Sequence, residues 1–198
     1  MTTAWPVTVI LLAAGQSRRM RGKNKLHLKI GNTTVLRRSY DNAVTAQPEK
    51  IIVVVAETVV GELLSSAVNT KLVVCETAAK GMSESLKTGI LAAGGDSEAV
   101  LVMLADQPCI STQTVQQYFR LFAEGKKLVA GHYKQFIGCP ALFHRDYFDE
   151  LLQLSGDRGA RSVLESHRKE LATVDIPEEE AFDIDVQEDI VKMEQTFK

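Results

Sequence analysis

The sequence has few of the residues that build disulfide frameworks and zinc sites. Its three cysteines, Cys75, Cys109 and Cys139, are odd in number, far apart and without a Cys-x-x-Cys pair. The four histidines are equally scattered, so they give no metal-ligand spacing. We therefore expect the cysteines to be reduced, small apolar residues of a cytoplasmic protein.

A strong excess of one charge and long apolar runs are also lacking. The formal net charge is -2, whereas nucleic-acid-binding proteins normally show a basic excess or a basic stripe. No apolar stretch approaches the roughly 20 residues that span a bilayer, and the first residues lack the charged-then-apolar pattern of a secretory signal. We expect neither a nucleic-acid partner nor a membrane association.

What the chain does have is an alternation of strand-like and helix-like segments along most of its length. This order predicts one α/β domain over residues 1–198, with a mainly parallel sheet and helices on both faces. Two late strands are expected to pair antiparallel at one edge, and 177–180 to form a solvated acidic loop. The expected strands are a first one beginning at Val7 and then 51–55, 72–75, 99–104, 128–132, 139–143 and 172–176; the expected helices are 34–46, 59–68, 83–93, 112–123, 146–153, 160–167 and 186–196.

The segment that follows the first strand has the order of a nucleotide-binding loop. Small residues, Ala13-Ala14-Gly15, come first, and Arg18, Arg19, Lys23 and Lys25 follow. Small residues allow a ligand to lie against the backbone, and the cations suit its phosphates. A tight turn before a solvated basic surface is the alternative, but the ordered combination favours a nucleotide site.

Two acidic positions are candidates for a metal site. Asp106 stands two residues beyond the strand 99–104, and ligands of open α/β sheets bind beyond the carboxyl ends of the strands. A carboxylate there can hold Mg²⁺ together with nucleotide phosphates, although Asp106 could also be a turn residue before Pro108. Alternation places Asp183 and Asp185 on one side of an extended segment. Asp185 is then either a second Mg²⁺ ligand or the cap of the last helix.

The start of the helix 83–93 is a further candidate. It follows Gly81-Met82, and its free backbone N–H groups and the hydroxyls of Ser83 and Ser85 could hold a ribose or a phosphate. A capped helix start explains the same residues equally well.

Taken together, these motifs resemble the molybdenum cofactor cytidylyltransferases, within the larger group of MobA-like nucleotidyltransferases. The resemblance covers essentially the whole chain and implies a Rossmann-like sheet with a small antiparallel extension. The matching segments are Ala13-Ala14-Gly15-Gln16-Ser17-Arg18-Arg19-Met20, Lys25, Gly81-Met82-Ser83-Glu84-Ser85-Leu86, Asp106-Gln107-Pro108, Gly138-Cys139-Pro140, Gly156-Asp157-Arg158-Gly159-Ala160-Arg161 and Asp183-Ile184-Asp185.

The resemblance implies a reaction in which CTP and the molybdopterin form of the cofactor give the cytosine dinucleotide form and pyrophosphate. It implies Mg²⁺ as the metal and an apo-molybdoenzyme of the xanthine dehydrogenase type as a possible recipient. The implied roles are nucleotide contact for Ala13, Ala14 and Gly15, triphosphate neutralisation for Arg19 and Lys25, cytidine binding for Gly81 and Ser85, and Mg²⁺ ligation for Asp106 and Asp185. Segments 138–140 and 156–161 are the implied contributors to the pterin pocket.

One departure from the family pattern concerns the basic loop. Arg21 is an extra residue between Met20 and Gly22, so the assignment of the lysine role to Lys25 rather than Lys23 depends on how the loop absorbs it. The alternatives are the same reaction with GTP, transfer to a sugar or polyol phosphate, and a carrier that delivers molybdopterin without catalysis. The presence of both a lysine and two candidate metal ligands favours catalysis.

Overall fold

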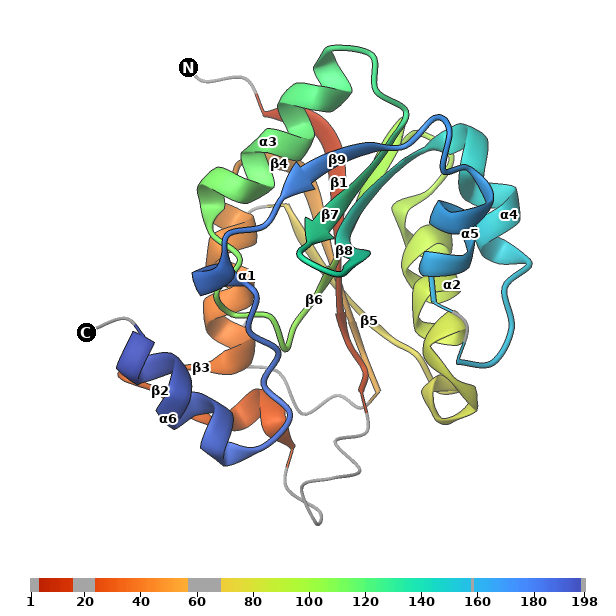
Figure 1. The fold of residues 1–198 in the computed structure, drawn as a ribbon. Helices are drawn as coiled ribbons and strands as arrows, with labels where there is room; N and C mark the ends of the chain where they lie inside the picture. The colour runs from red at the N-terminus through yellow and green to blue at the C-terminus, as the bar shows by residue number, and fades with distance from the viewer. Residues whose placement is uncertain (1–3, 16–23, 57–68, 158, 197–198) are drawn as a thin grey trace.

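The computed structural model describes residues 4–15, 24–56, 69–157 and 159–196 (Figure 1). The predicted helix 59–68 and the residues Arg18, Arg19, Arg21 and Lys23 lie outside this range. Within the range, no helix is both long and apolar enough to cross a membrane.

The core of the fold is a seven-stranded sheet in the order β5-β4-β1-β6-β8-β7-β9. Strands β5, β4, β1 and β6 run parallel, β8 runs antiparallel to both of its neighbours, and β9 pairs parallel with β7. The bounds are β1 Trp5–Ala13, β4 Pro48–Val55, β5 Thr70–Val74, β6 Ala99–Leu104, β7 Leu128–Tyr133, β8 Phe136–His144 and β9 Ala172–Asp175.

The predicted fold class, a mainly parallel Rossmann-like sheet with helices on both faces, is confirmed. The placement of the antiparallel pair at an edge is wrong, because β8 lies inside the sheet between β6 and β7 and β9 forms the edge. An apolar pattern marks a strand as buried but does not name its neighbours.

Helices cover both faces of the sheet, with α1 and α3 on one side and α2, α4 and α5 on the other (Figure 1). Successive residues of β1 point to opposite faces. Val9 and Leu11 pack with α1 and α3, whereas Ile10 packs with α2. This double burial explains the nearly continuous apolar run of β1. The helices are α1 Val35–Thr45, α2 Met82–Ala93, α3 Thr112–Ala123, α4 Phe148–Leu152, α5 Arg161–Ser166 and α6 Gln187–Thr196.

Short polar side chains set the starts of two helices. The Thr34 hydroxyl accepts a hydrogen bond from the backbone N–H of Arg37 before α1, and the Ser111 hydroxyl accepts one from Thr114 before α3. Elements that the sequence did not predict are the hairpin of β2 Lys29–Ile30 and β3 Thr33–Thr34 and the 3-10 turns η2 Lys25–His27, η3 Ala78–Lys80, η4 Arg145–Tyr147 and η5 Glu178–Glu180. The last of these turns replaces the expected acidic loop.

Candidate nucleotide and metal site

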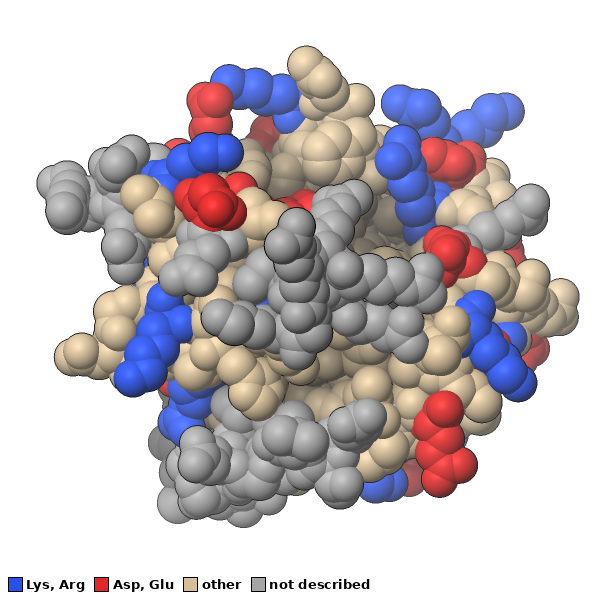
Figure 2. Space-filling model, turned by 90° about the horizontal axis from the view of Figure 1, so that it is seen from below, with Lys and Arg blue, Asp and Glu red and all other residues tan. Residues whose placement is uncertain are grey.

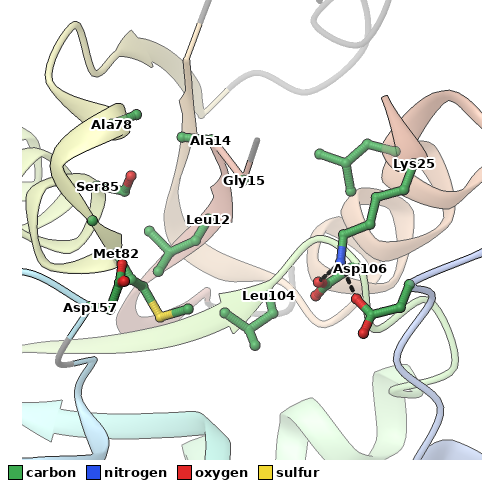
Figure 3. Close-up of a pocket in the computed structure, with 13 residues that line it drawn as sticks. Leu12, Ala14, Gly15, Lys25, Ala78, Met82, Ser85, Leu104, Asp106 and Asp157 are labelled. Carbon is green, nitrogen blue, oxygen red and sulfur yellow. Dashed lines mark hydrogen bonds and ion pairs between the residues drawn. The ribbon is translucent and has the colours of Figure 1, made fainter. Parts of the chain in front are cut away.

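A pocket of about 330 Å³ opens at the carboxyl ends of β1 and β6, near the small end of the range for ligand pockets. Leu12 of β1 pairs with Leu104 of β6, so the residues that follow both strands emerge at one edge of the sheet. Figure 3 shows side chains of α2 on one side of the pocket and Lys25 and Asp106 on the other. The lining residues are Leu12, Ala14, Gly15, Lys25, Leu26, Ala78, Gly81, Met82, Ser85, Leu104, Asp106, Asp157 and Asp185.

The face of the molecule on this side carries both signs of charge. Figure 2 views this face from below and shows Lys and Arg interspersed with Asp and Glu among the described residues. Among the described residues that line the pocket, one cation, Lys25, faces three aspartates, Asp106, Asp157 and Asp185.

Lys25 bridges the two predicted metal ligands. Its ammonium nitrogen, Nζ, lies 2.6 Å from Oδ2 of Asp106 and 2.9 Å from Oδ1 of Asp185 (dashed in Figure 3). The side chain of Lys25 is held at this place by η2, which Asn24 caps by accepting a hydrogen bond from the backbone N–H of Leu26. Three segments that are far apart in the sequence thus meet at one nitrogen atom.

The ion triad keeps Lys25 positively charged. Burial disfavours the ammonium form, but the charges of Asp106 and Asp185 and their hydrogen bonds outweigh burial, and the pKa of Lys25 rises above its ordinary value of 10.5. A permanent cation at the pocket is suited to binding phosphate oxygens.

The donor set also fits a divalent metal ion. Asp106 and Asp185 each bring one carboxylate oxygen within hydrogen-bond distance of the same nitrogen, so both carboxylates can reach one cation. No group of three or more His, Cys, Asp or Glu side chains that could hold a metal occurs in the described part of the chain. Mg²⁺ fits this donor set, because it commonly takes one or two carboxylates and completes its coordination with substrate phosphates and water.

Gly81, the residue before α2, allows a close approach between two segments of backbone. Its φ is +131°, and a Cβ atom at this position would lie 2.4 Å from the carbonyl carbon and oxygen of Gly156. The backbone N–H of Ser83 donates to that same Gly156 oxygen at 3.2 Å. The contact brings Asp157 to the wall of the pocket beside the start of α2.

The structure brings most of the predicted site residues together. Seven of them line the one pocket: Ala14, Gly15, Lys25, Gly81, Ser85, Asp106 and Asp185. The side chain of Ala13 packs in the core on the α1 face instead, because neighbouring strand residues point to opposite faces. Arg19 lies outside the described residues. Segment 138–140 does not contribute to the lining, whereas Asp157 of segment 156–161 does.

Sequence reasoning missed several lining residues. Leu12, Leu26 and Leu104 read as ordinary core residues, and Ala78 carries no chemical signal. Met82 is 46% exposed although it is apolar, and its place at the start of a helix beside Gly81 is the signal that could have identified it.

Residues 9–171 match the family described as the MobA-like NTP transferase domain. A curated relative, the bifunctional protein GlmU of Solibacter usitatus, is 30% identical over 124 residues, which cover 61% of this chain and 26% of that protein. The chain thus spans about a quarter of the length of this relative.

Three solved structures share the fold over nearly the whole chain. A homologue of Mycobacterium tuberculosis Rv0371c from Mycobacterium sp. strain JC1 is 26% identical with a TM-score of 0.79, covering 98% of this chain and 100% of that one. The manganese complex of M. tuberculosis Rv0371c itself has 24% identity, a TM-score of 0.76 and coverages of 96% and 98%. A nucleotidyl transferase from Methanothermobacter thermautotroptrophicus has 23% identity, a TM-score of 0.79 and coverages of 96% and 97%. The chain therefore belongs to the MobA-like NTP transferase family.

Proposed function

We propose that the protein transfers the cytidylyl group of CTP to the molybdopterin form of the molybdenum cofactor. The products are the cytosine dinucleotide form of the cofactor and pyrophosphate. The observation that carries the proposal is the position of Lys25 between Asp106 and Asp185, at the edge where the Ala14-Gly15 loop and the start of α2 enclose a pocket. The proposed recipient of the product is a molybdoenzyme of the xanthine dehydrogenase type, in the cytoplasm.

The acceptor is already a nucleophile, because its terminal phosphate is an anion near neutral pH. One of its oxygens attacks the α-phosphorus of CTP in line with the bond to the β-phosphate, and the electron pair of that bond leaves with pyrophosphate. No general base is needed, so the reaction requires only that anions be brought together and that charge on the leaving group be stabilised.

The chain's own residues can meet both requirements. Beside Gly15 a Cβ would contact none of the described residues within 4 Å, which lets the nucleotide approach the backbone. Gly81, just before α2, and Ser85, in its first turn, face the nucleotide, and Lys25 turns its ammonium from the carboxylates to the triphosphate. Asp106 and Asp185 would hold Mg²⁺, which when bound neutralises phosphate charge. The manganese complex of Rv0371c supports divalent metal use in a protein of this fold.

Pyrophosphate release tests the proposal. Purified protein is assayed with Mg²⁺ and CTP, GTP, ATP or UTP, with and without molybdopterin. We expect release with CTP that depends on molybdopterin and is lost in Asp106→Asn, while Asp149→Asn, a change at an exposed aspartate of α4, retains it. Preference for GTP, release with a sugar phosphate in place of molybdopterin, or molybdopterin binding without release would each contradict the proposal.

A further inference from the structure

The two aspartates of Asp183-Ile184-Asp185 have different partners. Oδ1 of Asp185 accepts from Lys25 at 2.9 Å, whereas Oδ1 of Asp183 accepts from the side-chain amide Nε2 of Gln107 at 2.8 Å. Between them, the backbone N–H of Ile184 donates to the carbonyl oxygen of Asp106 at 2.9 Å. Each residue of the triplet is therefore held, and two of the three contacts come from neighbouring positions, 106 and 107.

The orientation of Gln107 is fixed by a chain of hydrogen bonds. The Tyr133 hydroxyl donates its proton to the carbonyl oxygen of Cys139. The hydroxyl oxygen of Tyr133 is therefore the acceptor in its longer contact with Nε2 of Gln107, at 3.4 Å. The two protons of Nε2 are then directed at Tyr133 and Asp183. Gln107 is 7% exposed, and its amide cannot turn without losing both partners.

This chain connects the sheet to the C-terminal segment. It runs from β8 through Tyr133 at the end of β7 and through Gln107 after β6 to Asp183. The residues around Asp183 and Asp185 form no strand, so no ladder of backbone hydrogen bonds fixes their position. The contacts from Gln107 and from the Asp106 carbonyl hold Asp183 and Ile184, and the backbone N–H of Asp185 donates to Oδ2 of Asp189 at 3.0 Å.

We propose that Gln107 and Asp183 are positioning residues that place the carboxylate of Asp185 opposite that of Asp106, and that Asp183 does not itself bind the metal. The inference rests on the proposed metal role of Asp106 and Asp185. Its physical basis is the hydrogen bond rather than the negative charge of Asp183. Groups that orient metal ligands in this way typically contribute about 10–100-fold to metal affinity.

Substitutions at Asp183 separate the hydrogen bond from the charge. Asp183→Asn keeps an Oδ1 acceptor for Gln107 but removes the charge, whereas Asp183→Ala removes both. Gln107→Met removes the donor at similar volume. Asp183 is exposed, so its variants remain informative even if Gln107→Met fails to fold. Asp149→Ala, an exposed change on α4, serves as the control.

The measurement is Mn²⁺ binding to the full chain, followed by the electron paramagnetic resonance signal of free Mn²⁺, with thermal unfolding as a check of folding. We expect Asp183→Ala and Gln107→Met to weaken binding about tenfold, and Asp183→Asn to stay within about threefold of the parent. Equal losses in Asp183→Asn and Asp183→Ala would overturn the inference, because Asp183 would then act through its charge. So would unchanged binding in Asp183→Ala.

Two further variants distinguish failure of this inference from failure of the proposed metal site. If Asp106→Asn and Asp185→Asn do not weaken Mn²⁺ binding, the metal site is wrong and the positioning role is wrong with it. If they abolish binding while Asp183→Ala leaves it unchanged, only the positioning role is refuted.

Discussion

Replacing Gly81 by alanine tests the close contact between the start of α2 and residues 156–157. Gly94, at the other end of α2, offers a matched control, because both glycines have ψ of 170° and positive φ, +131° at Gly81 and +81° at Gly94. Side chains rarely adopt this region, and forcing one into it costs about 1–3 kcal/mol. A Cβ at Gly94 would contact nothing within 4 Å in the part of the chain that the structure describes, so Gly94→Ala carries this conformational cost without a steric overlap.

Gly81→Ala carries the same cost together with a steric overlap. The new Cβ would lie 2.4 Å from the carbonyl of Gly156 and 2.9 Å from the nitrogen of Asp157, and backbone atoms cannot rotate aside as a flexible side chain can. Overpacking typically adds about 1–3 kcal/mol. We therefore expect Gly81→Ala to lower the free energy of unfolding by about 2–6 kcal/mol, against about 1–3 kcal/mol for Gly94→Ala.

Urea unfolding followed by far-ultraviolet circular dichroism measures both losses. A loss of this size is a large part of the roughly 5–15 kcal/mol that stabilises a typical domain. Equal losses in the two variants would refute the reasoning, because they would mean that the backbone at Gly156 moves away without cost.

Three further predictions follow from buried groups. Lys25→Met removes the cation that lies 2.6 Å from Asp106, so Mn²⁺ alone should bind more tightly and turnover should fall about 10²–10³-fold; weaker Mn²⁺ binding in a calorimetric titration would contradict this. Burial raises the pKa of Cys109 from 9.0 to about 11. The unfolded thiol then loses its proton first, so this thiol alone should contribute a fall in the free energy of unfolding of about 1.4 kcal/mol per pH unit between those values. Cys109→Ala should flatten that decline in urea titrations, and an unchanged slope would show that this thiol does not cause it. The Ser83 hydroxyl is buried without a hydrogen-bond partner among the described residues, so Ser83→Ala should leave thermal stability unchanged or raise it by up to about 1 kcal/mol; a clear loss would reveal a hidden partner.

The strands and the edge that carries the site could be predicted because their signals are local. An uninterrupted apolar run such as that of β1 indicates a strand buried on both faces. Because the first strand and the strand 99–104 are expected in one mainly parallel sheet, Asp106 and the Ala14-Gly15 loop are expected at the same edge. The start of α2 is expected at this edge too, because it follows the strand predicted at 72–75 in the same sheet.

The remaining features depend on contacts between distant residues. The pairing of β8 with β6 and the approach of Gly81 to Gly156 leave no periodic pattern in the sequence. The partner of Lys25 could not be predicted either, because a lysine after a loop can reach many acids. Ala13 illustrates the same limit, because a shift of one residue along a strand reverses the face that a side chain occupies and so decides between pocket and core.

Because the antiparallel strand β8 lies next to β6, the sheet is completed only late in the synthesis of the chain. The four parallel strands all lie before residue 105, and β8 joins them only after residues 136–144 have been made. Until then, the apolar strand β6, Ala99–Leu104, has β1 on one side and an unpaired row of backbone N–H and C=O groups on the other. Such an edge is a template for association with another chain. A nascent chain that ends between β6 and β8 is thus open to aggregation along the edge of β6, and pairing of β8 closes that edge.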